Sequence, residues 1–242
     1  MENHTNPENK KAAVGAMFDS IADRYDFLNH FLSLGIDRTW RKKAIKIISR
    51  SPRHSRILDV ATGTGDLAIA AMKLNPEKVT GIDISPGMLV IGREKIRQKG
   101  LSGRIELFHG DSQNIFFPDN SFDVTMVTFG VRNFTDPVKG LIEMNRVLLP
   151  GGMIMVLEFS KPTTFPFKHI FNFYFLRILP LFGRIVSKNR EAYQYLPDTV
   201  MKFPDNEEFI KLLSLAGFTR INQKRLSFGI ASIYTGFKSD VQ

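Results

Sequence analysis

The sequence predicts a doubly wound α/β fold built on a mostly parallel sheet of seven strands. From Arg56 onward, short apolar runs end in Gly or Asp, and each run is followed by a segment with helical spacing. Repeated strand–helix units of this kind give a parallel sheet that is covered by helices. The chain has 242 residues, of which 43% are hydrophobic. That length suits one core, so we predict a single domain over residues 1–242.

The N-terminal segment, residues 1–50, is predicted to be helical. Apolar residues recur there at helical spacing, as at Val14, Met17, Phe18 and Ile21. No strand pattern competes in this segment.

The central residues 56–160 are predicted to form the ligand-binding core. We expect five strands with helices between them, at residues 56–60, 78–83, 105–109, 122–129 and 152–159. An aromatic, basic and proline-bearing insertion at residues 161–203 interrupts the pattern. Residues 204–242 close the domain, with a helix at 205–216 that ends at Gly217 and strands near 219–226 and 231–237.

The composition excludes some kinds of functional site and favours some kinds of binding partner. The net charge of +9 favours partners such as phosphates, nucleic acid or anionic lipid. The absence of cysteine excludes disulfides, thiolate metal sites and cysteine nucleophiles. Residues 1–11 are polar and lack the apolar core of a signal peptide, so we expect a cytoplasmic protein. The most apolar stretch, residues 165–186, contains too many charges for a membrane span.

A glycine-containing turn, DVATGTGD at residues 59–66, follows the first predicted strand and opens a helix. Gly63 and Gly65 allow a ligand to approach the backbone closely. We therefore predict that Gly63, Thr64 and Gly65 contact a cofactor. Such turns also bind dinucleotide phosphates or simply connect two elements.

Asp83 ends the second predicted strand, about twenty residues after the turn, where a carboxylate can accept both hydroxyls of a ribose. Both NAD and S-adenosylmethionine carry that ribose. The turn has Ala68 where a dinucleotide fingerprint has its third glycine, a variant that some dehydrogenases permit. A nicotinamide dehydrogenase therefore stays open as an alternative.

Residues 110–134, GDSQNIFFPDNSFDVTMVTFGVRNF, resemble the corresponding stretch of class I methyltransferases, which have a Rossmann-like fold. The resemblance implies S-adenosyl-L-methionine as methyl donor and no metal. It also implies that Asp111 accepts from the adenine amino group, that Ser112 lies beside the ring and that Thr128 touches the cofactor. The alternative for Asp111 is a helix cap.

A narrower resemblance begins at residues 25–40, YDFLNHFLSLGIDRTW, which look like the signature of the menaquinone and ubiquinone biosynthesis C-methyltransferase family. Further segments that match are FDSIADRYD, DVATGTGD, GREK at residues 92–95, FGVRN at 129–133, LEFSKP at 157–162, and YQYLPDTV followed by FP. The chain departs from the family pattern at Asp37, where His is usual, and at Leu149, where a basic residue is common. We treat Asp37 as structural.

The resemblance implies C-methylation of demethylmenaquinol to menaquinol. Alternatives are the polyprenyl benzoquinol of the ubiquinone pathway, an RNA or small-molecule class I methyltransferase, and a non-catalytic cofactor-binding scaffold. An RNA enzyme is disfavoured because TFGVRNF stands where amino-group methyltransferases usually carry an Asn/Asp-Pro-Pro-aromatic motif. We expect no nucleic-acid partner.

The candidate catalytic residues are Arg132, Asn133 and Tyr25. Arg132 follows the fourth strand and is predicted to stabilise a developing phenolate, with Asn133 orienting it. Tyr25 and Asp26 belong to the N-terminal signature, which we expect to fold over the pocket as a lid. The alternatives are a surface Arg paired with an acid and a core Tyr.

The insertion at residues 165–190 mixes aromatic and basic side chains. This composition suits transient contact with a membrane surface that holds a polyprenylated quinol, peripheral at the inner face of the cell membrane. Packing on the domain or a homodimer contact would need the same composition.

Overall fold

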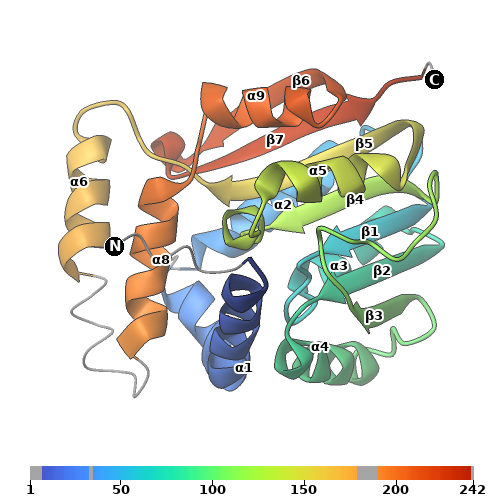
Figure 1. Ribbon diagram of the computed structural model, residues 1–242, viewed down its shortest axis with the longest axis horizontal. Helices are drawn as coiled ribbons and strands as arrows, with labels where there is room; N and C mark the ends of the chain where they lie inside the picture. The colour runs from blue at the N-terminus through green and yellow to red at the C-terminus, as the bar shows by residue number, and fades with distance from the viewer. Residues whose placement is uncertain (1–6, 33–34, 179–189, 241–242) are drawn as a thin grey trace.

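A seven-stranded sheet forms the centre of the fold, with strand order β3-β2-β1-β4-β5-β7-β6 (Figure 1). The computed structural model describes residues 7–32, 35–178 and 190–240. The strands are β1 (Arg56–Val60), β2 (Lys78–Asp83), β3 (Ile105–His109), β4 (Phe122–Thr128), β5 (Leu148–Phe159), β6 (Phe218–Leu226) and β7 (Ala231–Lys238). Strands β1 to β5 are mutually parallel, and β7 runs antiparallel to β5 and β6. The predicted mostly parallel, doubly wound sheet is confirmed.

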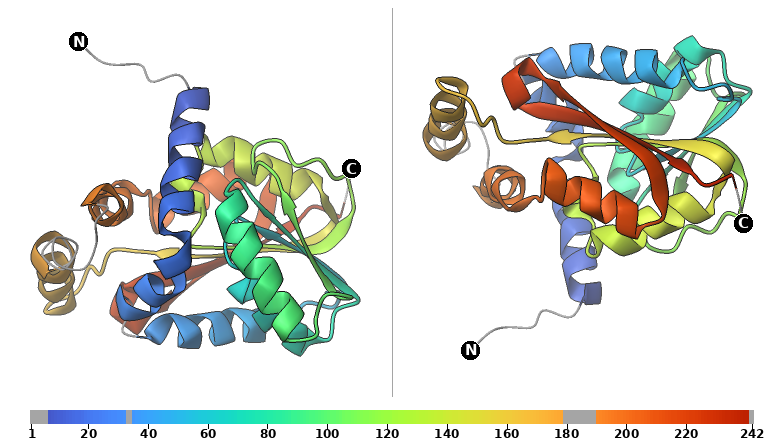
Figure 2. Two further views of the ribbon diagram at one scale, coloured as in Figure 1. Left: turned by 90° about the horizontal axis from the view of Figure 1, so that it is seen from below. Right: turned by 90° about the horizontal axis from the view of Figure 1, so that it is seen from above.

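Helices cover both faces of the sheet, as Figure 2 shows. One face packs on α2 (Ile36–Ile48), α3 (Asp66–Ala71) and α4 (Pro86–Gln98), and the other on α5 (Pro137–Arg146) and α9 (Glu207–Leu215). The predicted N-terminal helices are confirmed as α1 (Pro7–Leu32) and α2. Helix α2 begins after Gly35, which takes the left-handed conformation, and its apolar stripe buries Trp40 and Ile48.

The end of β4 and the start of β5 differ from the predicted bounds. Strand β4 ends at Thr128 because Phe129 has a positive φ of 55°, which breaks the extended conformation. Strand β5 starts at Leu148, before the Pro-Gly-Gly turn, because Leu148 already pairs with Phe122. A register shift between Phe122 and Val124 then accommodates the turn, at which Gly151 has a φ of 71°.

The insertion lies beyond the carboxyl end of β5 (Figure 1). It contains α6 (Phe167–Phe173), a π-helical turn η3 (Tyr174–Ile178) and α8 (Arg190–Lys202). Phe171 and Phe175 pack with Val200 of α8 in a separate apolar cluster. In the described part of the chain, no helix is both long and apolar enough to cross a membrane.

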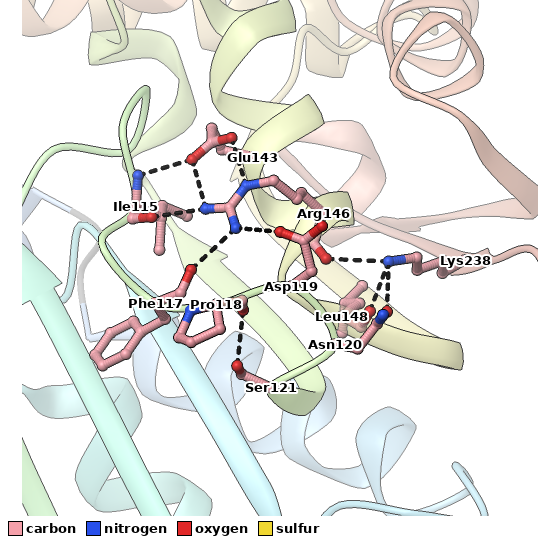
Figure 3. A network of polar contacts seen from close by, with 10 residues as sticks. All are labelled: Ile115, Phe117, Pro118, Asp119, Asn120, Ser121, Glu143, Arg146, Leu148 and Lys238. Atoms are coloured by element: carbon pink, nitrogen blue, oxygen red, sulfur yellow. Dashed lines mark hydrogen bonds and ion pairs between the residues drawn. The ribbon is translucent and has the colours of Figure 1, made fainter.

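Arg146, at the end of α5, anchors the loop that follows β3 (Figure 3). Its guanidinium donates to the carbonyl oxygens of Ile115 at 2.6 Å and Phe117 at 3.0 Å. It also pairs with the carboxylate of Glu143 at 2.8 Å, and this pairing lowers the pKa of Glu143. The same Glu143 accepts from the backbone N–H of Ile115 at 2.9 Å. This network holds the loop whose first residues reach the functional site.

Candidate active site

A cleft lies at the carboxyl ends of β1, β2 and β4. In the strand order, β1 and β4 flank the point at which the chain reverses direction across the sheet, and ligands of α/β proteins bind at such points. The open space of the cleft, including the solvent at its mouth, is about 670 Å³. Its wall includes the predicted cofactor residues Gly63, Asp83, Asp111, Ser112 and Thr128.

The glycine turn is tied directly to the end of β2. The backbone N–H of Gly63 donates to the Oδ2 atom of Asp83 at 2.8 Å, and the Thr62 N–H donates to the Ile82 carbonyl at 3.0 Å. Gly63 has a φ of 55° and Gly65 a φ of 78°, so both take the left-handed conformation that favours glycine. Gly63 lines the cleft, whereas Gly65 shapes the turn behind it without lining the cleft.

Two further glycines let the turn sit close to its neighbours. A Cβ atom on Gly81 would lie 2.9 Å from the Thr62 hydroxyl, and one on Gly92 would lie 3.1 Å from the Thr64 backbone carbon. Only glycine therefore fits at these positions without displacing the turn. Sequence reasoning assigned neither one a role, although Gly92 opens the GREK segment.

The carboxylate of Asp83 is buried and accepts hydrogen bonds from backbone N–H groups. Its Oδ1 atom accepts from the Ser85 N–H at 2.9 Å, and its Oδ2 atom accepts from Gly63. Burial raises the pKa of Asp83, and these backbone donors oppose the rise. An ionised carboxylate has about four acceptor positions. The backbone N–H of Ile84 is a further donor to this carboxylate. The contact of Asp83 with the hydroxyls of a ribose stays a prediction.

Asp111 and Ser112 lie in the loop after β3, on the opposite wall of the cleft from the glycine turn. The Oδ1 atom of Asp111 accepts from the Gln113 N–H at 3.0 Å, and its Oδ2 atom accepts from Lys11 Nζ at 2.7 Å. The residue forms a bridge with Asn114 in a turn, not the start of a helix. The alternative of a helix cap is therefore wrong.

Helix α1 forms a wall of the cleft, through Lys11, Val14 and Phe18. Asp19 fastens it to the start of α4, because its Oδ1 atom accepts from the Ser85 hydroxyl at 2.5 Å and the Gly87 N–H at 2.8 Å. Helix α1 therefore lines the cleft, and its action as a lid stays a prediction. Tyr25 and Asp26 lie in α1, but their side chains are outside the described part of the structure.

A second hollow adjoins the cleft and shares Ala61, Gly63, Thr128 and Phe129 with it. It is lined by charged and hydroxyl side chains, which are Arg41, Asp59, Thr62, Thr64 and Asp66. Arg41 is held by an ion pair with Asp37, one turn earlier on α2, and lies 3.8 Å from Asp66. Asp37 is therefore structural in this chain. A hollow with both charge signs suits the zwitterionic amino-acid end of a cofactor.

Asp59 is buried beneath this hollow, and its burial raises its pKa from 3.8 to about 7. Between these two values the folded protein binds a proton that the unfolded chain has released, so this residue reduces stability as the pH rises. We compare the free energy of unfolding of Asp59→Asn with that of the wild type. The difference should shift in favour of the variant by about 2–4 kcal/mol from pH 5 to pH 8. Urea unfolding at both pH values measures this. An equal difference at the two pH values would contradict the prediction.

Thr128 supplies the clearest sign that the cleft is built for a ligand. Its hydroxyl is buried and, among the described residues, has no hydrogen-bond partner. Buried polar groups without a partner are rare in native proteins and are commonly satisfied by a ligand or water. Thr128 lines both the cleft and the second hollow. Together with Asp83, it shows that the residues present fit a polar nucleoside cofactor.

The predicted catalytic residues Arg132 and Asn133 lie in the short helix η2 (Val131–Asn133) after β4. Arg132 is buried, and its Nη1 atom donates to Glu158 at 2.7 Å and to the Phe129 carbonyl at 2.6 Å. Arg132 therefore forms an ion pair with an acid, which was the alternative to a catalytic role. The pair lies in the interior of the protein and not on its surface as that alternative had it. Asn133 lines the cleft.

Tyr195 of α8 completes this side of the site. Its hydroxyl donates to the Asn133 Oδ1 atom at 3.1 Å, and its ring packs edge-on against Phe18 at 6.4 Å. Burial raises the pKa of Tyr195, so its phenol stays protonated near neutral pH. Sequence reasoning did not single out Tyr195, nor Glu158. The only signal was that both stand in segments that match the family pattern, YQYLPDTV and LEFSKP.

Comparison with known proteins identifies the family of this chain. Residues 5–238 match the ubiE/COQ5 methyltransferase family. The chain belongs to the ubiE/COQ5 methyltransferase family. A demethylmenaquinone methyltransferase of Bacteroides fragilis is 47% identical over 97% of this chain and 96% of its own length. A ubiquinone/menaquinone biosynthesis C-methyltransferase UbiE of Geobacter sulfurreducens is 48% identical over 95% of this chain and 90% of its own length.

Solved structures agree with the fold of a class I methyltransferase. A methyltransferase of Thermotoga maritima superposes with a TM-score of 0.65 at 20% identity, covering 93% of this chain and 100% of that chain. A methyltransferase of Aquifex aeolicus superposes with a TM-score of 0.58 at 20% identity, covering 81% of this chain and 88% of that chain. The predicted family, fold class and enzyme class, an S-adenosylmethionine-dependent methyltransferase, are confirmed.

Proposed function

We propose that this family member transfers a methyl group from S-adenosylmethionine to a ring carbon of demethylmenaquinol, giving menaquinol. One observation carries the proposal: a single cleft is lined by Asp83, Asp111 and Asn133, and Asn133 accepts a hydrogen bond from the Tyr195 hydroxyl behind it. Relatives named demethylmenaquinone methyltransferase support this acceptor, since one is 47% identical over nearly the whole chain.

Bound S-adenosylmethionine supplies a methyl group on a positively charged sulfur. The residues of the chain must align that methyl with the acceptor carbon at about 3–3.5 Å and keep water out. Asp83 would hold the ribose, Asp111 and Ser112 would hold the adenine, and Gly63, Thr64, Gly65 and Thr128 would hold the rest of the cofactor. The chemistry it would supply is a methyl group whose bond to sulfur breaks with the electron pair left on sulfur, and the acceptor ring would give up one proton to solvent.

The acceptor has to be a reduced ring, because a hydroquinone hydroxyl that loses its proton directs electron density onto the neighbouring carbon. Arg132 is buried and does not line the cleft, so it is proposed to stabilise this developing phenolate through a water, with Asn133 orienting the ring. Tyr25 is proposed to contact the quinol head from α1. The carbonyl of Phe129 accepts from both Arg132 and Asn133, at 2.6 and 3.4 Å, which supports their acting together.

Tyr195→Phe tests the acceptor end of the cleft. Removal of the hydroxyl frees the Asn133 amide, so we expect kcat to fall about tenfold, while stability changes by only about 1 kcal/mol. Cofactor affinity is expected to stay unchanged, because Tyr195 does not line the cofactor wall. Steady-state kinetics and calorimetry measure the two effects. Tyr174→Phe, which removes a hydroxyl outside the cleft, is the matched control.

The reaction itself is tested by incubating the protein with labelled S-adenosylmethionine and chemically reduced demethylmenaquinone in detergent. We expect label in the reduced quinol only. The oxidised quinone serves as control, because its ring is a poor nucleophile. Equal methylation of both forms would contradict the phenolate argument.

The benzoquinol of the ubiquinone pathway is the second candidate acceptor. Relatives named ubiquinone/menaquinone biosynthesis C-methyltransferase UbiE favour it, at 47–48% identity over 95% of this chain. Competition between the two reduced acceptors, each at several concentrations, separates them by the ratio of their kcat/KM values.

The remaining proposals concern the location of the enzyme, its metal requirement and its partners. We propose a cytoplasmic enzyme that needs no metal and no nucleic acid and takes its polyprenylated quinol at the membrane surface. Activity is expected to survive dialysis against EDTA. RNA crosslinking, or heparin retention that falls steeply with salt, would instead support a nucleic-acid substrate.

A further inference from the structure

An exposed apolar stripe lies along α6 and the turn before it. Phe165 is 82% exposed, Ile170 59% and Phe173 62%. Ile170 and Phe173 are three residues apart and so lie on one helix face, opposite the buried Phe171 and Phe175. Single exposed apolar residues are ordinary, but a contiguous group marks an interaction surface.

Phe228 extends this stripe from a distant part of the chain. It is 69% exposed, and its ring stacks on Phe167 of α6 with centroids 3.8 Å apart. Phe228 stands in the turn η4 (Ser227–Gly229) with a φ of 58°, a conformation that costs energy for a large side chain. The turn therefore holds an aromatic ring outward beside α6. We call Phe165, Ile170, Phe173 and Phe228 the α6 face.

The segment that carries α6 has basic charges only. Residues 159–178 contain no Asp or Glu, and their basic residues are Lys161, Lys168 and Arg177. Lys168 and Arg177 are exposed, and neither forms an ion pair with a described residue. An apolar stripe beside unpaired basic residues is complementary to a surface that offers both hydrocarbon and negative charge.

The α6 face connects to the active-site cleft through packed aromatic rings. Phe129, which lines the cleft, stacks on Phe159 at 4.6 Å. Phe159 contacts Phe175 at 5.9 Å, and Phe175 stacks on Phe171 of α6 at 4.2 Å. Apolar side chains thus run without interruption from the cleft wall to the inner side of α6. Because these rings pack against one another, they fix the position of α6 relative to the cleft wall.

We infer that the α6 face docks the enzyme on an anionic lipid bilayer. The inference rests on the proposed function only in that a polyprenylated acceptor resides in the bilayer. A second copy of the chain fits less well, because a two-fold contact would bring the same basic residues together. A bilayer offers negative headgroups to the basic side chains and a hydrocarbon layer to the apolar side chains of the α6 face.

Sedimentation with vesicles tests the inference. We expect the wild-type protein to bind vesicles of phosphatidylcholine with phosphatidylglycerol, and to bind pure phosphatidylcholine much less. The variant Phe165→Ser/Ile170→Ser/Phe173→Ser should lose about a hundredfold in partition coefficient, because three apolar side chains no longer enter the bilayer. Lys168→Glu/Arg177→Glu should lose roughly fivefold or more for each charge reversed.

The matched control is Val90→Ser/Ile142→Ser/Leu215→Ser, which removes three exposed apolar side chains from α4, α5 and α9. It should bind anionic vesicles as the wild type does. Equal vesicle binding by the α6 variant and this control would overturn the inference. So would a wild-type dimer that the α6 variant turns into a monomer without any vesicle binding by the wild type.

Methylation assays separate this inference from the proposed function. The α6 variant should methylate a water-soluble, short-chain quinol at the wild-type rate, and a vesicle-embedded polyprenyl quinol at a rate at least tenfold lower. Equal rates of the variant and the wild type on the embedded quinol would overturn the inference. Vesicle binding by a wild-type protein that methylates neither quinol would overturn the proposed function and support the docking face.

Discussion

Asp83→Ala is expected to weaken S-adenosylmethionine binding by about a hundredfold or more. The carboxylate is proposed to accept both ribose hydroxyls, and each hydrogen bond to a charged group contributes about 1.5–3 kcal/mol. The substitution also removes the acceptor of the Gly63 N–H, which ties the glycine turn to β2, and of the Ser85 N–H at the start of α4. Titration calorimetry with S-adenosylmethionine measures the loss.

Two controls make the Asp83 result specific. Glu94→Ala removes an exposed carboxylate from α4 that pairs only locally with Arg97, so cofactor affinity should not change. Asp83→Asn keeps one carbonyl acceptor and should lie between the wild type and Asp83→Ala. Normal cofactor affinity in Asp83→Ala, in a protein whose melting temperature is unchanged, would refute the assigned role.

Arg132→Ala is expected to have two effects at once. Glu158 would be left as a buried carboxylate without its partner, which destabilises a protein by about 3–5 kcal/mol. Turnover should also fall, by about a hundredfold, if the guanidinium stabilises the phenolate that forms in the reaction. Cofactor affinity should stay near normal, because Arg132 does not line the cofactor cleft. Denaturant unfolding, steady-state kinetics and calorimetry measure the three quantities.

A double variant separates the structural from the catalytic contribution of Arg132. Arg132→Met/Glu158→Leu removes both charges together and leaves apolar side chains of similar size, which is often neutral for stability. We expect stability to recover while turnover stays low. Recovery of turnover along with stability would show that Arg132 only supports the local structure.

The sequence by itself determined the central part of the fold and the cofactor wall. Strands β1, β2 and β3 have the predicted bounds. A short apolar run predicts a buried strand, and the Gly or Asp that follows the run marks where the strand ends. Gly63, Asp83 and Asp111 follow neighbouring strands. Since the carboxyl ends of parallel strands meet at one edge of a sheet, their placement in one cleft followed from the strand order alone.

Only the tertiary structure decided which side chains meet across the site. Lys11 pairs with Asp111 from 100 residues away, and Tyr195 reaches Asn133 from 62 residues away. Glu158 comes beside Arg132 because β4 and β5 are neighbours in the sheet. Local periodicity tells which face of an element is buried, but it does not tell which distant element covers that face. Those contacts depend on how helices pack on the completed sheet.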